Sequence, residues 1–254
     1  MAALARILRY GYRVPWLGWH LLVNLPVALL LIAAGQGGSD DEDRLDHRAI
    51  RWWSGGLARV FGFRLRRVGT PLPGGTMFVA NHVSWIDIVV LHSQHMMGFV
   101  AKREIRDWPL VGWMATRAQT IFHKRGSNES LGGVLEAMIG RLREGHAVAA
   151  FPEGGTRGGD SLGPFHARIF LAAVEAGAPV QPVALRYGTA GEAQTVVAFR
   201  PRERFLGNFL RLLGEPAREG EVVFLEPIHA GTLEGRRRIA DTARARIAAA
   251  LGQA

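Results

Sequence analysis

Two hydrophobic patterns divide the chain. The first is a continuous apolar stretch over residues 14–34, inside a segment (14–39) that contains no Asp, Glu, Lys or Arg. The second begins at residue 44 and consists of short apolar runs that alternate with stretches of helical periodicity. An acidic run separates the two. We therefore expect an N-terminal apolar segment with an acidic linker over residues 1–43 and one folded domain over residues 44–254.

The apolar segment has the length and flanks of a membrane anchor. As a helix, its 21 residues would extend about 30 Å, close to the thickness of a bilayer core. Trp16 and Trp19 lie near one end, where interfacial aromatic residues belong. Asn24 and Pro26 interrupt the middle and predict a kink or a re-entrant pair of short helices. A signal peptide and a buried core helix are the alternatives.

The charges around this segment do not decide whether it crosses a membrane. Basic residues precede the segment and resume after the acidic run (Arg6, Arg9, Arg13; Arg48, Arg51, Arg59). A re-entrant or interfacial anchor would leave both flanks on the cytoplasmic side. We therefore expect an association with the cytoplasmic face of the inner membrane, by a segment that either spans the membrane or re-enters it.

The remainder of the chain predicts an α/β fold. The expected strands are residues 63–68, 76–80, 98–101, 120–123, 147–151, 180–186, 195–200 and 221–225. The expected helices are residues 44–62, 85–94, 110–117, 130–144, 167–176 and 233–251. This alternation indicates a mixed central sheet flanked by helices. Residues 205–213 (FLGNFLRLL) fit either an interfacial stretch or a core helix.

The composition limits the partners and the nucleophiles that we expect for this chain. A formal net charge of +9 favours anionic partners such as lipid headgroups, acidic carrier proteins or nucleic acid. The chain has no recognisable nucleic-acid motif, and its aromatic residues lie near apolar runs, which argues against nucleic acid. Cysteine is absent, so the chain has no disulfide, no thiolate nucleophile and no Cys-ligated zinc.

His82 and Asp87 form the first chemistry-bearing pattern. The expected strand 76–80 runs directly into NHVSWID. Five residues on one ideal helix correspond to about 140° of rotation, so the pair would meet only if His82 lies in the turn and Asp87 in the first helical turn. A carboxylate on one imidazole nitrogen raises the basicity of the other. With neither a G-x-S-x-G elbow nor Cys in the sequence, the attacking group would belong to the substrate, such as an alcohol.

This pattern has two other interpretations. His82 could cap a helix while Asp87 pairs with an arginine. A zinc site is a weaker interpretation, because H-E-x-x-H is absent and no third ligand stands at metal spacing.

Two further clusters follow expected strands. TIFHKR ends on Arg125, whose guanidinium could grip a phosphate in bidentate fashion. FPEGGTR is a glycine-rich turn whose backbone N–H groups suit an anion, and in it Glu153 could hold a hydroxyl or a cation, or pair with Arg157. A solvated basic strand end and an ordinary tight turn are the alternatives.

Together these segments resemble the 1-acylglycerol-3-phosphate acyltransferase (lysophospholipid acyltransferase) family. NHVSWID is similar to its N-H-x-x-x-x-D block, TIFHKR to its second block, FPEGGTR to its F-P-E-G block and VQPVAL to its late proline-bearing block. The four blocks occur in the family's order. The resemblance covers well over a hundred residues and implies the glycerolipid acyltransferase fold, a mixed sheet with flanking helices.

The resemblance also implies a mechanism. His82 would be the general base on the acceptor hydroxyl, with Asp87 orienting it. The hydroxyl would attack the thioester of acyl carrier protein or coenzyme A, without a cofactor, a metal or a covalent enzyme intermediate. Arg125, Glu153 and Gly154 would hold the acceptor headgroup at the membrane surface, with Arg157 as a further contact.

Two departures from the family pattern bear on the acceptor. The third block usually reads F-P-E-G-T-R, and the extra Gly155 moves the arginine one place later, to Arg157. In the second block Gln119 stands where glycine is usual, and His123 replaces an apolar residue. We expect 1-acylglycerol-3-phosphate as the acceptor, which would give phosphatidate. The alternatives are another lyso-lipid, such as a lyso-ornithine lipid, or a non-catalytic membrane-binding protein with this fold.

Overall fold

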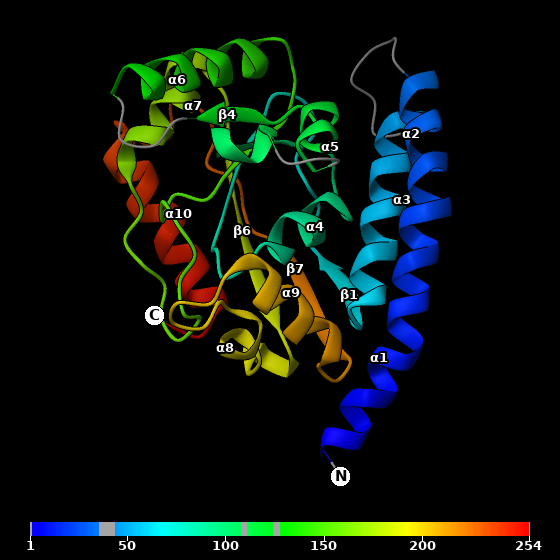
Figure 1. The fold of residues 1–254 in the computed structure, drawn as a ribbon. Helices are drawn as coiled ribbons and strands as arrows, with labels where there is room; N and C mark the ends of the chain where they lie inside the picture. The colour runs from blue at the N-terminus through cyan, green and yellow to red at the C-terminus, as the bar shows by residue number, and fades with distance from the viewer. Residues whose placement is uncertain (1, 36–43, 108–110, 124–127, 254) are drawn as a thin grey trace.

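A mixed β-sheet forms the centre of the protein (Figure 1). The computed structural model describes residues 2–35, 44–107, 111–123 and 128–253. Within them, seven strands follow the order β1-β7-β6-β2-β5-β3-β4. All neighbouring strands are parallel except β6 and β7. The strands are β1 (Phe63–Val68), β2 (Met77–Ala80), β3 (Gly98–Lys102), β4 (Ile121–His123), β5 (Val148–Ala150), β6 (Val180–Tyr187) and β7 (Arg218–Phe224).

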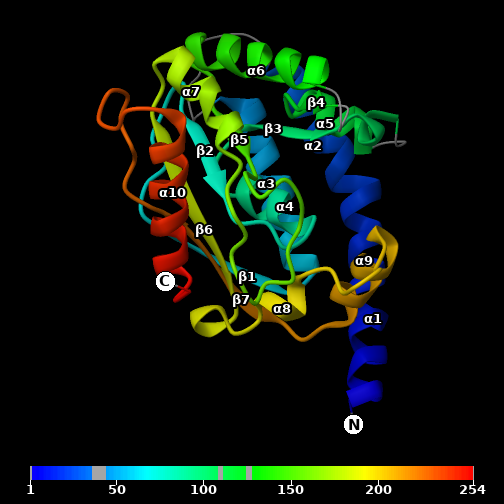
Figure 2. The ribbon, with the colours of Figure 1, turned by 90° about the vertical axis from the view of Figure 1, so that its left-hand side faces the viewer.

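Helices cover both faces of the sheet (Figure 2). Successive side chains of a strand point to opposite faces. Accordingly, Phe78 of β2 packs with α3 (Leu45–Val60), α4 (Ile86–His92) and α9 (Phe205–Gly214). Its neighbour Met77 packs with α6 (Asn128–Arg143), α7 (Leu171–Ala176) and α10 (Arg236–Ala250). The mixed sheet between helical layers confirms the predicted fold class.

The N-terminal segment is one long helix along the flank of the domain (Figure 1). It consists of α1 (Ala2–Trp19), a π-helical turn η1 (His20–Asn24) and α2 (Leu25–Ala34). Over Ala3–Ala34 it is long and apolar enough to cross a membrane, by length and composition. The predicted interruption appears as the π turn, because Pro26 has no N–H for the regular helical bond. His20 in this turn hydrogen bonds through Nε2 to the carbonyl of Trp53, which ties the helix to α3.

Most predicted elements are present, and one is wrong. The expected strand at 195–200 is instead the short helix α8 (Gln194–Val197) and a turn. The nearest strand, β6, already pairs with β2 on one side and β7 on the other, so it offers no edge. The expected helix 167–176 begins as a 3-10 helix (Ala167–Phe170) before α7. The expected acidic linker lies outside the described residues.

Candidate active site

The predicted contact between His82 and Asp87 is present. β2 ends at Ala80, so His82 lies in the turn after it, and Asp87 lies in the first turn of α4. His82 Nδ1 is 2.8 Å from Asp87 Oδ2. The same oxygen accepts the backbone N–H groups of Val83 and Ser84 at 2.7 and 2.9 Å. The carboxylate therefore shapes the turn and holds the imidazole at once.

Tyr187 occupies the second oxygen of this carboxylate, a contact that the sequence interpretation missed. Its phenol donates to Asp87 Oδ1 at 2.6 Å from β6, the strand beside β2. Burial, followed by the charge of Asp87, raises the pKa of the Tyr187 phenol well above its ordinary value. The phenol thus stays a donor. The alternation of Val183, Leu185 and Tyr187 along one strand face was the signal that could have identified it.

The His82 ring is packed on one side and reachable on another. It stacks on Phe151, with ring centroids 3.9 Å apart and planes 12° apart. Its side chain is 16% exposed. Within the described residues, Nε2 of His82 has no hydrogen-bond partner. Since Nδ1 faces a carboxylate, it holds the ring proton, and Nε2 is left with a lone pair that can accept a proton.

Glu153 points inward, toward the backbone of the turn that carries His82. Its side chain is 1% exposed. Oε1 accepts the N–H of His82 at 2.9 Å, and Oε2 accepts the N–H of Gly163, also at 2.9 Å. Burial raises the pKa of this carboxyl, while the two backbone N–H groups oppose that rise. Both carboxylate oxygens of Glu153 thus face backbone N–H groups, one of them the N–H of His82, and the headgroup contact of Glu153 stays a prediction.

Gly154 and Arg157 belong to the same turn, after β5. The backbone of Gly154 is left-handed (φ +73°), and a Cβ there would lie 3.0 Å from the His166 ring. The N–H of Arg157 donates to the carbonyl of His82 at 2.8 Å, so this turn lies against the turn that carries His82. The Arg157 side chain is 43% exposed, with Nε 3.6 Å from Glu153 Oε2. Its guanidinium therefore still faces solvent.

The same turn carries unused backbone donors. In the part of the chain that the structure describes, the N–H groups of Gly155 and Thr156 have no acceptor. Successive N–H groups in a glycine-rich turn suit an anion. Arg125, the remaining predicted contact, lies outside the described residues.

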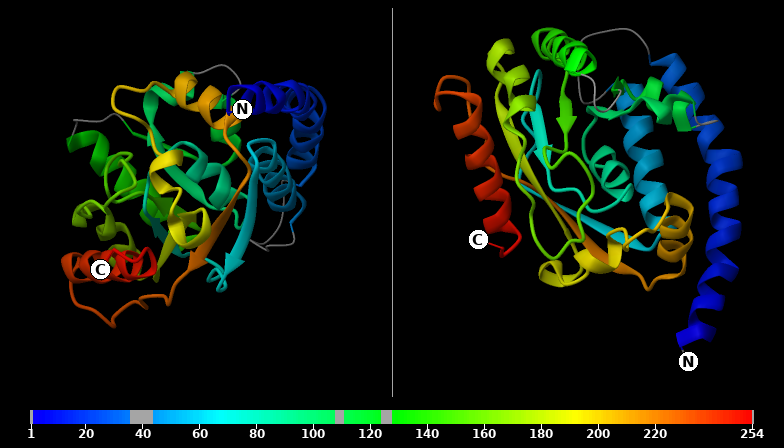
Figure 3. Two further views of the ribbon diagram at one scale, coloured as in Figure 1. Left: turned by 90° about the horizontal axis from the view of Figure 1, so that it is seen from below. Right: turned by 60° about the vertical axis from the view of Figure 1, so that its left-hand side comes forward.

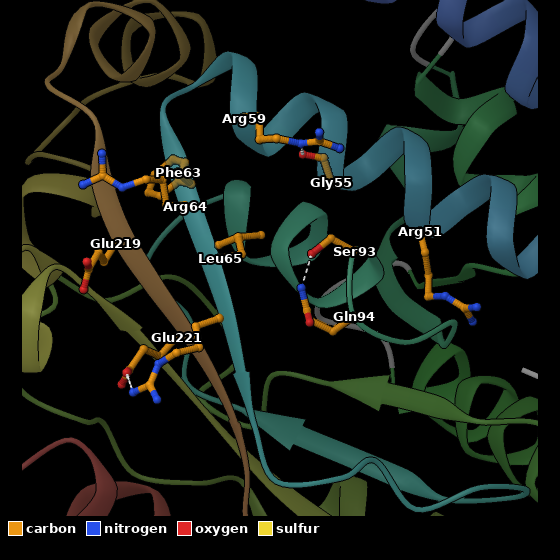
Figure 4. Close-up of a pocket in the computed structure, with 11 residues that line it drawn as sticks. Arg51, Gly55, Arg59, Phe63, Arg64, Leu65, Ser93, Gln94, Glu219 and Glu221 are labelled. Atoms are coloured by element: carbon orange, nitrogen blue, oxygen red, sulfur yellow. Dashed lines mark hydrogen bonds and ion pairs between the residues drawn. The ribbon is translucent and has the colours of Figure 1, made fainter.

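A separate cavity of about 610 Å³ is lined by a different set of residues (Figure 4). It opens between α3, the end of α4 and the β1 edge of the sheet, and none of the predicted site residues that the structure describes lines it. Four arginines and two glutamates contribute to its wall, and Arg66 pairs with Glu221. The described site residues therefore lie at the strand ends, outside the wall of this cavity. Among the described residues, no group of three His, Asp or Glu side chains could hold a metal ion.

Comparisons with known proteins show which families and relatives this chain resembles. The family described as Acyltransferase matches residues 66–186. The chain is 37% identical over 188 residues to the lyso-ornithine lipid O-acyltransferase of Pseudomonas aeruginosa, covering 74% of this chain and 72% of that one. It is 40% identical over 154 residues to the 1-acyl-sn-glycerol-3-phosphate acyltransferase of Neisseria meningitidis, covering 60% of each chain.

A solved structure shares the fold. The 1-acyl-sn-glycerophosphate acyltransferase PlsC of Thermotoga maritima superimposes with a TM-score of 0.75 at 17% sequence identity, over 100% of this chain and 97% of that one. The likeness to this structure shows the fold, and the sequence relatives show the family. The protein belongs to the lysophospholipid acyltransferase family and is an acyltransferase.

Proposed function

We propose that the protein moves a fatty acyl chain from a thioester to the free hydroxyl of a lyso-lipid, with His82 as general base and Asp87 orienting it. The observation that carries this proposal is the His82–Asp87 contact, which leaves Nε2 of a partly exposed imidazole unpartnered within the described residues. The two carboxylate oxygens are fully occupied by His82, two backbone N–H groups and Tyr187. The imidazole is thereby fixed in one orientation and tautomer.

The proposed reaction has no covalent enzyme intermediate. Nε2 of His82 takes the hydroxyl proton as the oxygen attacks the thioester carbonyl and forms the new C–O bond. Asp87 stabilises the imidazolium that results. The tetrahedral intermediate then collapses, the C–S bond breaks, and the leaving thiolate takes the proton back from Nε2. Since the chain contains no Cys, a thiol intermediate on the enzyme is not available.

Two neighbouring groups support this chemistry. Glu153 fixes the backbone of His82 through the N–H of that residue. The N–H groups of Gly155 and Thr156, which have no acceptor among the described residues, lie in the turn that contacts the His82 carbonyl, and we assign them to the oxyanion of the tetrahedral intermediate. Removal of one such donor typically costs about a hundredfold to a thousandfold in kcat.

The first candidate acceptor is 1-acylglycerol-3-phosphate, which would give phosphatidate. Arg157 and Arg125 would face its phosphate, because arginine binds phosphate in bidentate fashion. The acyl donor would be acyl carrier protein or coenzyme A thioester, with no other cofactor. Both donors are cytosolic, so the protein would work at the cytoplasmic face of the inner membrane, held there by the N-terminal helix.

A lyso-ornithine lipid is the second candidate, and the extent of similarity favours it. The lyso-ornithine lipid acyltransferases of Pseudomonas aeruginosa and Brucella abortus align with 74% and 78% of this chain, against 52% and 60% for the two Neisseria relatives. The extra Gly155 in the third block changes the turn that precedes Arg157. This turn lies beside the turn that carries His82, which we call the catalytic turn. A change there fits an acceptor whose headgroup is not a phosphate.

An acceptor panel with both thioester donors tests the proposal. Wild-type protein in mixed micelles should acylate one acceptor class far faster than the other. His82→Ala should lower kcat about a hundredfold to ten-thousandfold, the usual contribution of a general base. His229→Ala, which removes an exposed histidine, is the matched control and should leave the rate unchanged. Unchanged transfer in His82→Ala would contradict the mechanism, and no transfer to any acceptor would favour a non-catalytic membrane protein.

A further inference from the structure

Helix α9 has two distinct faces. One face is buried: Asn208 and Leu212 are inside the protein, and Phe209 stacks on Trp85. The other face exposes Leu206 and Leu210, which are 63% and 47% exposed and stand one helical turn apart. Two large leucines on one exposed helix face are unfavourable in water unless something covers them.

The segment before α9 is strongly basic. Arg200, Arg202 and Arg204 are all exposed. None of the three pairs with a carboxylate among the described residues. The one acid between them, Glu203, turns inward, where Arg211 binds it at 2.8 Å and lowers the pKa of its carboxyl to about 2. The outer surface therefore presents uncompensated positive charge next to the two leucines.

The first turns of α1 lie beside α9. Tyr10 donates to the carbonyl of Leu210 at 2.7 Å, and Arg9 to that of Gly214 at 2.6 Å. Seen from below, the orange α9 and the blue start of α1 run along one edge of the molecule (Figure 3). The outer side of α1 exposes further large apolar residues: Leu4, Ile7 and Leu8, each more than 60% exposed. The exposed leucines of α9 thus continue the apolar surface of the N-terminal helix.

From this arrangement we propose that residues 200–210 form a second membrane-contact surface, which seats on a bilayer containing anionic phospholipids. Leu206 and Leu210 enter the boundary between headgroups and acyl chains, and the three arginines bind lipid phosphates. The mixture of basic and apolar residues on a short amphipathic helix fits a lipid surface. This inference goes beyond acyl transfer, because it concerns where the domain sits rather than what it catalyses.

The buried face of α9 connects this surface to the catalytic turn. Oδ1 of Asn208 accepts hydrogen bonds from Ser84 Oγ and Trp85 Nε1, both at 3.0 Å. Ser84 and Trp85 lie between His82 and Asp87 in the chain. A bilayer that holds α9 therefore holds the catalytic turn at the lipid surface, where a lyso-lipid resides.

Single-cysteine labelling tests the proposal without using activity. Because the chain has no cysteine, Leu206→Cys or Leu210→Cys gives one site for an environment-sensitive fluorophore. With full-length protein and vesicles containing phosphatidylglycerol, the label at 206 or 210 should shift to shorter wavelength and be quenched by spin-labelled lipid. Leu22→Cys on the N-terminal helix, where Leu22 is 79% exposed, is the positive control. Val174→Cys on α7, 44% exposed, is the matched negative control.

The labelling results distinguish a bilayer from a second copy of the chain at this surface. Lipid quenching at 22 but not at 206 or 210 would overturn the proposal while leaving the anchor intact. A blue shift at 206 without vesicles that grows with protein concentration would instead indicate a second copy of the chain, and would also overturn it.

A charge-matched pair of variants tests the arginines. The triple change Arg200→Gln, Arg202→Gln and Arg204→Gln should reduce binding to anionic vesicles by roughly fivefold for each charge removed, and binding to neutral vesicles much less. The same three substitutions at Arg236, Arg237 and Arg238, which are exposed on α10, remove equal charge elsewhere. Equal losses in both triples would show that net charge alone drives binding and would contradict a localised surface.

Discussion

The phenol of Tyr187 lies 2.6 Å from Oδ1 of Asp87, although the two residues are 100 positions apart. A buried carboxylate needs partners for both oxygens, and Tyr187 fills the one that His82 and the two backbone N–H groups leave open. The orientation of the imidazole therefore depends on a strand that carries no charged catalytic group of its own.

Tyr187→Phe should slow catalysis while leaving acceptor affinity nearly unchanged. The variant keeps the ring but loses a hydrogen bond to a charged group, about 1.5–3 kcal/mol in such settings. We expect kcat to fall roughly tenfold or more, with acceptor KM within about twofold. Steady-state kinetics measures both, and Tyr12→Phe on the exposed side of α1 is the matched control. A raised KM with normal kcat would count against a positioning role.

Glu153→Gln should also act on kcat. A glutamine can accept only one of the two N–H groups that Glu153 accepts, so its amide NH2 would face either His82 N–H or Gly163 N–H. The backbone of His82 would shift, and we expect kcat to fall about tenfold or more. Glu219→Gln, at an exposed position, is the control. If Glu153 instead bound the headgroup, the main change would be in acceptor KM.

Asn208→Ala should destabilise the protein. Asn208 is fully buried, and its loss leaves Ser84 Oγ and Trp85 Nε1 without their acceptor. We expect a loss of about 2–4 kcal/mol, seen as a Tm lowered by roughly 5–15 °C in detergent micelles. Combining it with Ser84→Ala should cost less than the sum of the two single changes, because the pair shares one hydrogen bond. Strict additivity would contradict this coupling.

Acid should destabilise the fold through His92. Burial lowers the pKa of this histidine from 6.5 to about 4, and its Nε2–H donates to the carbonyl of Met97 at 3.0 Å. The unfolded chain takes up a proton below pH 6.5, whereas the folded chain does so only below about pH 4. Stability is therefore complete above pH 6.5 and falls between pH 6.5 and 4, by on the order of 3 kcal/mol.

His92→Gln isolates this effect. Glutamine can keep a donor toward Met97 without titrating. The stability of the variant, measured by chemical denaturation across this pH range, should fall less than that of the wild type. Parallel curves for the two proteins would show that His92 does not cause the acid sensitivity.

The sequence predicted the helices and strands better than the contacts between segments that are distant in the chain. The strand at 63–68 has the predicted bounds, and the His82–Asp87 contact follows from a strand, a turn and a helix start. Local pattern could not exclude a strand at 195–200, because that depends on which sheet edges are already occupied. Gln119, noted as standing in a usual glycine position, indeed has left-handed backbone (φ +58°). A position that needs a left-handed backbone can therefore be recognised in the sequence even where a residue other than glycine occupies it.

Contacts between distant segments could not be predicted. From the sequence, Arg6, Arg9 and Arg13 are expected only as basic residues that precede the apolar segment. Arg13 is instead 1% exposed and donates to the carbonyls of Leu213 and Glu215. These pairs are about 200 residues apart, and neither periodicity nor motif carries information about them.

The arginines of α1 have a consequence for preparing the protein. A helix leaves its last carbonyls without internal donors, and for α9 those donors come from Arg9 and Arg13. Removal of residues 1–43 to obtain a soluble fragment would leave these carbonyls without their hydrogen-bond donors. It would also expose the surface at Gly62, which the Arg13 guanidinium covers. The N-terminal helix is therefore part of the packed structure of the enzyme as well as an apolar segment. A chain without it should aggregate even in the absence of lipid.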